Sequence, residues 1–216
     1  MIKGMSATPR PSLRQEQKER TAQRLTEAAR EAFETSGYAA TTVDEIVRIA
    51  GTSRGTFYLH FDSKAAALLA VLHDLELQDD YRLLIEAFRA ISAPTVDALH
   101  PWVEQLADFV GENRQIHRAL YEAQATDPDF AETWRGQFDD WGLAWETLTF
   151  VEGVDGEDLE VGASLTFALT YQFFHLYFHG GLEVDRKRAT RLIAEFMHLA
   201  LRPSCGCSCA CCTGHR

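Results

Sequence analysis

The apolar residues of this chain recur at helical spacing, and no stretch alternates in strand fashion over more than a few residues. The first helical run starts near Glu16 and stops at Gly37, a residue type that commonly terminates helices. The pattern therefore predicts a first helix over 16–37. Its inward positions are Ala22, Leu25, Ala29, Ala32 and Phe33.

Two short helices follow, joined by a turn that contains glycine. Thr42 with Glu45 three residues later is a capping-box pattern, which predicts a helix start. Gly51-Thr52-Ser53 ends that helix, and the Ser53 hydroxyl can cap the next one. Two short helices with such a turn are typical of a helix-turn-helix.

Apolar periodicity predicts further helices at 64–91, 95–111, 115–125, 128–149, 157–180 and 185–200, about nine in total. We therefore expect an all-α fold, with an N-terminal three-helix unit at 16–64 and a larger helical domain at 65–202. Residues 1–15 are interpreted as a flexible basic arm, and residues 203–216 as a disordered cysteine-rich tail.

Charge divides the chain in the same place. The net charge is −11, yet residues 1–64 hold ten Lys and Arg against eight Asp and Glu, a balance of +2. Residues 65–216 hold eleven against twenty-four, a balance of −13. A mildly basic head on an acidic body suggests two modules with different partners.

Neither the N-terminus nor the longest uncharged stretch of the chain indicates a membrane protein. The N-terminus has no apolar segment of the kind a signal peptide needs, so we expect a cytoplasmic protein. No charged residue occurs from Val161 to Leu182, but polar residues interrupt this stretch at every turn. A helix buried on most sides explains it better than a membrane span.

The second short helix sorts by angle into an inner and an outer face. With Phe57 in the core, Phe61 lies on the same side, while Gly55 and Leu59 lie near the opposite pole. A glycine there lets the backbone approach another surface closely, and the polar residues around it suit phosphates and base edges. The structural alternative is an ordinary helical corner with solvated side chains. Candidate DNA contacts are Thr42, Ser53, Arg54, Gly55, Thr56, Tyr58, Leu59, His60 and Lys64.

The segment from Leu25 to Leu69 resembles the DNA-binding domain of the TetR family of bacterial transcriptional regulators. The resemblance rests on AAREAFETSGYAATTVDEIVRIAGTSRGTFYLHFDSKAAALL, above all on its Gly-Thr-Phe-Tyr-x-x-Phe-x-x-Lys core. It implies a homodimer that places two recognition helices in successive major grooves of a palindromic operator. At the position of Leu59 many relatives carry an aromatic or polar residue, so the base preference of that position in the family cannot be transferred to this chain. The positive charge that meets the DNA backbone would come from the N-terminal arm and the first helix, at Arg10, Arg14, Lys18, Arg20 and Arg24.

The resemblance also implies that residues 65–202 bind a small-molecule effector and dimerise through the last two long helices. The expected function is a repressor that a small, largely apolar or aromatic effector releases from DNA, although activation stays open. Aromatic stripes there are interpreted first as core, with a ligand cavity as the alternative. Candidate effector contacts are Trp102, Phe109, His117, Tyr121, Trp134, Phe138, Trp141, Phe167, Tyr171, Phe174 and His175.

No pattern of catalytic residues stands out, so we expect neither an enzyme nor a cofactor. His175 and His179 are four residues apart, and a packed or hydrogen-bonded pair is favoured over a metal site because no carboxylate or cysteine is spaced with them. The tail raises the alternative of a metal- or thiol-responsive protein. Its candidate ligands are Cys205, Cys207, Cys209, Cys211, Cys212 and His215.

Overall fold

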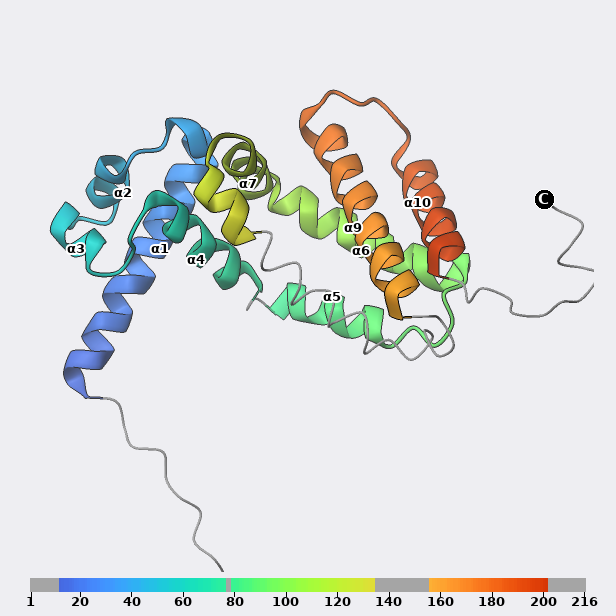
Figure 1. Cartoon of the computed structure of the whole chain (residues 1–216), viewed down its shortest axis with the longest axis horizontal. Coiled ribbons are helices and arrows are strands. Elements are labelled where there is room, and N and C mark those ends of the chain that lie inside the picture. The colour runs from blue at the N-terminus through green and yellow to red at the C-terminus, as the bar shows by residue number, and fades with distance from the viewer. Residues whose placement is uncertain (1–11, 77–78, 135–155, 202–216) are drawn as a thin grey trace, which may run out of the picture.

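The computed structural model describes residues 12–76, 79–134 and 156–201, and these are helical apart from short connections (Figure 1). The fold is all-α, which confirms the predicted class. The helices are α1 (Leu13–Ala40), α2 (Val43–Ile49), α3 (Arg54–Tyr58), α4 (Lys64–Glu76), α5 (Asp79–Arg89), α6 (Val96–Glu112), α7 (Arg114–Thr126), α9 (Gly156–His179) and α10 (Arg186–Leu201). Residues 128–134 are also helical.

Helix α1 starts earlier than predicted. Ser12 caps it by accepting a hydrogen bond from the backbone amide of Gln15 at 3.2 Å, so Arg14 belongs to the helix rather than to a flexible arm. The helical path breaks at Gly37, where φ is 77°. Gly37 therefore interrupts the helix as the sequence pattern predicts, and one further turn follows it.

The predicted single helix over 64–91 is wrong. Helix α4 ends at Glu76 and a separate helix, α5, starts at Asp79. Asp79 and Asp80 occupy the first turn of α5, where their negative charge is favourable beside the helix N-terminus. The apolar periodicity continues through this junction, which is why the pattern alone did not divide the two helices.

The N-terminal helices and the body share one continuous core. Helix α7 packs along α1, and α4 lies against both. Phe33, Phe57, Leu68, Ile116 and Leu120 are among the fully buried side chains. The unit that carries α2 and α3 is thus fastened to the body through α1 and α4 rather than joined by a free linker.

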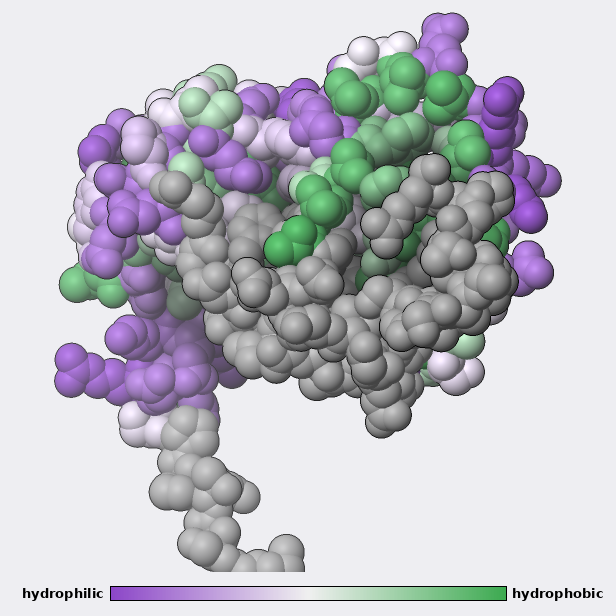
Figure 2. Space-filling view, turned by 45° about the vertical axis from the view of Figure 1, so that its right-hand side comes forward, coloured by the Kyte–Doolittle hydropathy of each residue, from purple (hydrophilic) through white to green (hydrophobic). Residues whose placement is uncertain are grey.

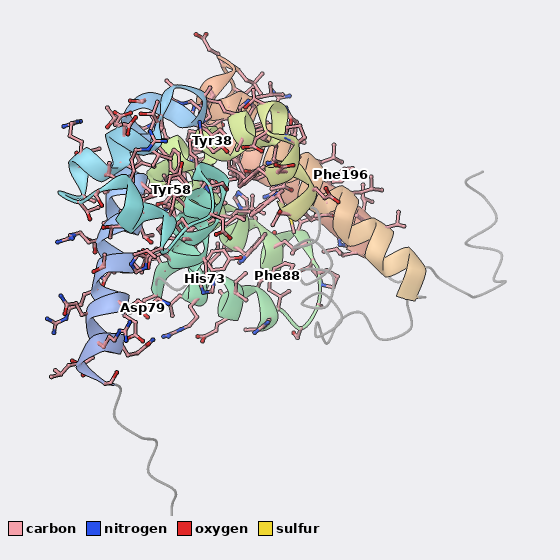
Figure 3. All side chains as sticks on the ribbon, turned by 60° about the vertical axis from the view of Figure 1, so that its left-hand side comes forward. Tyr38, Tyr58, His73, Asp79, Phe88 and Phe196 are labelled. Atoms are coloured by element: carbon pink, nitrogen blue, oxygen red, sulfur yellow. The ribbon has the colours of Figure 1, made fainter. Side chains whose placement is uncertain are left out.

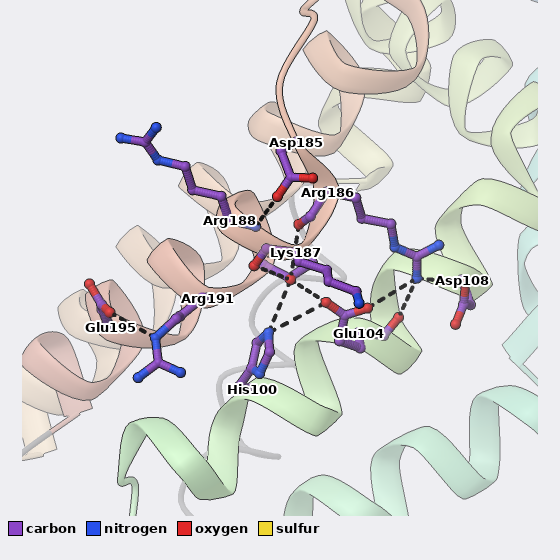
Figure 4. Close-up of polar contacts among 10 residues, drawn as sticks. His100, Glu104, Asp108, Asp185, Arg186, Lys187, Arg188, Arg191 and Glu195 are labelled. Carbon is purple, nitrogen blue, oxygen red and sulfur yellow. Dashed lines mark hydrogen bonds and ion pairs between the residues drawn. The ribbon is translucent and has the colours of Figure 1, made fainter.

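Helices α9 and α10 lie side by side at the end of the molecule far from α3 (Figure 1). Polar contacts hold α10 on α6 (Figure 4). Arg186 donates to Asp108 Oδ1 at 2.6 Å, and the Thr190 hydroxyl donates to the Glu104 carboxylate. His100 Nε2 lies 3.2 Å from the Thr190 hydroxyl. Within the described ranges, none of the helices combines the length and hydrophobicity that a membrane span requires.

Candidate nucleic-acid interface and effector site

A side-chain hydroxyl caps the N-terminus of each of the two short helices, α2 and α3. The Thr42 hydroxyl accepts from the Glu45 amide at 3.2 Å, and the Ser53 hydroxyl accepts from the Thr56 amide at 3.1 Å. Both residues therefore cap helices, as predicted. The connecting turn passes through Gly51 at φ 61°, in the left-handed region that favours glycine.

One buried phenylalanine fixes the orientation of α3. Phe57 is fully buried and its ring lies 5.6 Å from that of Phe61. On the other side, Leu59 is 76% exposed and Tyr58 is 47% exposed. A Cβ atom added at Gly55 would meet only the Ser53 hydroxyl, at 3.7 Å. Packing within the chain therefore does not require a glycine here, and the outward face has the arrangement that the helical angles predict.

Asp44 on α2 holds Arg54 on α3. One guanidinium nitrogen of Arg54 donates to both Asp44 carboxylate oxygens, at 2.9 and 2.8 Å. The hydrogen bond and the charge of Asp44 raise the pKa of Arg54 further. The guanidinium also lies 5.9 Å from the centre of the Tyr58 ring. Asp44 was absent from the sequence candidates, although an acidic and a basic residue flanking the turn were a usable signal.

Lys64 makes contacts within the fold that the sequence did not predict. Its ammonium donates to the carbonyls of Tyr38 and Thr41, at 2.7 and 3.0 Å, and lies over the Tyr38 ring. Burial lowers the pKa of Lys64. These bonds tie the start of α4 to the end of α1, so the charge also serves the fold, and a phosphate contact by Lys64 stays a prediction.

The other DNA candidates differ in how their side chains are engaged. The hydroxyl of Thr56 lies 3.0 Å from that of Ser53. His60 is half-buried, and burial together with the nearby charge of Lys18 lowers its pKa. The basic residues of α1, Arg14, Lys18, Arg20 and Arg24, are exposed on the half of that helix that projects beyond the body (Figure 1). Arg10 lies outside the described residues.

Five of the predicted effector contacts come together between α6, α7 and α9. The rings of Tyr121 and Tyr171 stack at 4.7 Å, and those of Tyr121 and His175 at 3.7 Å. His117 contacts Tyr171 edge-on at 5.8 Å and Phe109 at 6.3 Å. We call His117, Tyr121, Tyr171 and His175 the aromatic ladder.

The ladder buries polar atoms that have no partner. Both ring nitrogens of His117, the Tyr121 hydroxyl and Nδ1 of His175 are buried without a hydrogen bond. Burial and the positive charge that His179 can carry lower the pKa of His117 to about 4. Burial raises the pKa of Tyr121 and lowers that of His175. Buried polar groups are normally hydrogen-bonded, so these atoms are candidate ligand contacts.

The remaining effector candidates lie elsewhere or cannot be placed. Trp102 packs on Phe88 of α5 at 4.4 Å and donates its indole N–H to the Leu84 carbonyl at 2.9 Å. Trp134 stacks on Phe130. Phe174 is buried in the core. Phe138, Trp141 and the side chain of Phe167 lie outside the described residues.

The two histidines of α9 are packed against each other, and His179 is hydrogen-bonded, in agreement with the favoured interpretation. Their rings lie 5.5 Å apart, and His179 Nε2 lies 2.9 Å from the Arg114 carbonyl. Within 12–76, 79–134 and 156–201, no group of three or more potential ligands is placed to hold a metal ion. The cysteine-rich tail lies outside these ranges.

A second exposed surface covers α9 and α10. Figure 2 shows apolar side chains gathered over these helices. A groove between them is lined mainly by Leu169, Phe173, Leu176, Leu192, Ile193 and Phe196. Its polar margin includes Glu183, Asp185 and Arg188. An exposed apolar face of this extent commonly marks an interaction site.

A helix-turn-helix with an exposed recognition face, fixed to a helical body, defines the class of this protein. A family model described as bacterial regulatory proteins, tetR family, matches residues 25–71. The uncharacterized HTH-type transcriptional regulator TtgW of Pseudomonas putida is 37% identical over 114 residues, which cover 48% of this chain and 85% of that protein. The chain belongs to the TetR family.

Other relatives match over a smaller share of their length. The HTH-type transcriptional regulator EthR of Mycolicibacterium smegmatis is 33% identical over 132 residues, 61% of this chain and 57% of EthR. SrpR of Pseudomonas putida is 36% identical over 116 residues, 49% of this chain and 54% of SrpR. The matched part thus spans little more than half of these two relatives.

Solved structures share the fold across most of the chain. A TetR-family regulator from Mesorhizobium loti has a TM-score of 0.60 at 19% identity, over 85% of this chain and 96% of that one. FadR of Bacillus subtilis, in complex with stearoyl-CoA, has a TM-score of 0.60 at 15% identity, over 83% and 99%. The named relatives are regulators rather than enzymes, in agreement with the expected absence of catalysis.

Proposed function

We propose that this protein is a transcriptional regulator that reads operator DNA with the outward face of α3. The observation that carries the proposal is the exposure of Gly55, Tyr58 and Leu59 on a helix whose other side is held by Phe57. Gly55 lets the backbone approach the duplex, Tyr58 reaches a phosphate and Leu59 meets a thymine methyl. Such binding takes place on bacterial chromosomal DNA, hence in the cytoplasm.

Two further features support a role in DNA binding. Arg54 lies at the start of α3, so a phosphate can compete with Asp44 for its guanidinium. The exposed cations of α1 add a sequence-independent attraction, since each phosphate contact contributes about one unit to the salt dependence of binding. The excess of positive charge in residues 1–64 thus belongs with the DNA, and the acidic body points away from it.

The active form in this proposal is a homodimer through α9 and α10. The groove between these helices supplies an apolar surface that a second copy can cover, with Arg188 of one chain facing acidic residues at the margin of the other. A dimer presents two copies of α3, as a palindromic operator requires.

Effector binding in the body completes the proposed mechanism. A small, largely apolar or aromatic ligand binds at the aromatic ladder and favours a conformation with lower affinity for the operator, which makes the protein a repressor. Such a ligand acts only if it binds the two conformations with different affinities. The comparisons do not support the alternative of metal sensing through the cysteine tail.

Fluorescence anisotropy with the DNA that flanks the protein's own gene tests this function. At about 150 mM salt we expect one duplex to bind at least 1,000-fold more tightly than a shuffled duplex of equal length. Equal affinity for both duplexes contradicts the proposal. Genome-wide selection of bound fragments extends the test to operators located elsewhere.

A further inference from the structure

The aromatic ladder combines features that a purely structural core does not need. Its four side chains come in two pairs, His117 with Tyr121 on α7 and Tyr171 with His175 on α9, each four residues apart and so on one face of its helix. The contacts between the pairs bring these two faces together. Leucine or phenylalanine would fill the same space without burying polar atoms.

Buried polar atoms of His117, Tyr121 and His175 lack the hydrogen bonds that a folded core normally supplies. His117 has neither ring nitrogen bonded, and the Tyr121 hydroxyl is also unbonded. A buried polar group without a hydrogen bond destabilises the folded state. A ligand that hydrogen-bonds these atoms removes that cost, so their arrangement favours binding of a molecule with its own donor and acceptor.

The surroundings of the ladder select against charge in that molecule. Burial disfavours an ion of either sign. The charged groups near this site are Arg114 and Arg118, and Arg118 is paired with Glu122 at 3.6 Å. Burial lowers the pKa of His179, so the net charge nearby is that of Arg114, which disfavours a cation most strongly. His117, with its pKa of about 4, is neutral at pH 7 and offers one donor and one acceptor nitrogen.

The flat rings of the ladder select for shape. Tyr121 lies between Tyr171, inclined at 10°, and His175, inclined at 30°. Stacked rings accept another flat ring at low cost because offset stacking is a favourable arrangement. We propose that the aromatic ladder recognises an uncharged aromatic molecule that carries a single hydroxyl group, of the phenol class.

This inference rests on the proposed function, because it names the effector class of the same site. The phenolic hydroxyl donates to His117 or accepts from it, while Tyr121 supplies the second hydrogen bond. The ring takes a place in the stack with Tyr171 or His175. No covalent step is involved, and the ligand acts by its affinity alone.

Isothermal titration calorimetry with four ring compounds of one size tests the ligand class on the full chain at pH 7. The probes are 4-ethylphenol, ethylbenzene, 4-ethylbenzoate and 4-ethylbenzylammonium. We expect 4-ethylphenol to bind at least fivefold more tightly than each of the others, since one hydrogen bond is worth about that factor. Absence of 4-ethylphenol binding, or equal or tighter binding of either ion, overturns the proposal.

Variants locate the binding at the ladder. His117→Phe and Tyr121→Phe keep a ring and remove the polar atoms, so each should weaken 4-ethylphenol about five- to tenfold. Tyr177→Phe is the matched control, because Tyr177 packs on Phe173 and Phe178 instead of on the ladder. Unchanged affinity in both ladder variants, with their helical circular dichroism intact, contradicts the assignment.

The ligand class and the proposed function fail separately. Operator binding in the absence of any probe tests the regulator, because no ligand is involved. If the operator titration succeeds and 4-ethylphenol does not bind, the ligand class is wrong and the regulator stands. If no duplex is preferred, the proposed function fails whatever the calorimetry gives.

Discussion

Two groups of exposed large apolar side chains among the described residues differ in size and setting. At the C-terminal end of α3 they are Tyr58 and Leu59, two residues near capping hydroxyls and an arginine. On α9 and α10 they form a continuous face that includes Leu169, Leu192 and Phe196. Tyr58 and Phe196 lie toward opposite ends of the molecule (Figure 3).

The difference between these two surfaces follows from what each is proposed to meet. A DNA groove offers phosphates, base edges and scattered methyl groups, so isolated apolar residues among polar ones suit it. Another copy of the chain offers a matching apolar face, and burying such faces drives association. The two surfaces should therefore respond differently to substitution.

The largest expected effect comes from Leu192→Glu. Leu192 is 53% exposed, so the new charge should leave the monomer folded but prevent burial of the α9–α10 face. We expect a monomer in sedimentation experiments and operator affinity reduced by about 100-fold or more, because the two half-sites are no longer bound together. Lys187→Glu is the control, since Lys187 is exposed on α10 but does not line the groove. A dimer that survives Leu192→Glu removes this face as the interface.

Gly55→Ala should separate stability from DNA binding. The added methyl group meets only the Ser53 hydroxyl at 3.7 Å, and alanine favours a helix by up to about 1 kcal/mol over glycine. We expect an unchanged or higher melting temperature together with operator affinity reduced about 10- to 100-fold, because the backbone is held off the duplex. Unchanged operator affinity would mean that α3 does not approach DNA closely at Gly55.

Tyr58→Ala should weaken operator binding about fivefold and leave the dimer intact, since it removes one contact at the exposed end of α3. Anisotropy and sedimentation measure the two effects on the same sample. Tyr58→Phe separates the hydroxyl from the ring. If Tyr58→Ala binds like the wild type, the assignment of the outward face is wrong.

Asp44→Asn gives the smallest expected effect. It weakens the hold on Arg54, which then meets phosphates of any sequence more freely. We expect shuffled DNA to bind about two- to threefold more tightly, with a salt slope steeper by roughly one unit. A slope equal to that of the wild type would indicate that Asp44 does not limit the contact of Arg54 with the duplex.

The sequence allowed the N-terminal unit to be predicted in detail because its signals are local. Thr42 and Ser53 cap helices within three residues of themselves, and the inward position of Phe57 follows from helical angles alone. The contacts of Lys64 within the fold could not be predicted, for the opposite reason. The carbonyls that bind its ammonium belong to Tyr38 and Thr41, more than twenty residues earlier, so only the folded chain brings them together.

The candidate effector site could be predicted only in part. Residues four apart, such as His117 and Tyr121, were evident as one face of a helix. The sequence did not indicate that this face contacts Tyr171 and His175 on α9. It also did not indicate that the indole N–H of Trp102 donates to the Leu84 carbonyl on α5. These facts depend on how the helices pack, and apolar periodicity does not specify which helix faces which.

The central claim is that two copies of the chain read two half-sites with α3. A titration of the wild type against the preferred palindromic duplex, and against the same duplex with one half-site scrambled, tests it most directly. The account predicts two chains per intact duplex, bound about 100-fold or more tightly than the scrambled duplex. Equal affinity for the two duplexes would contradict the claim.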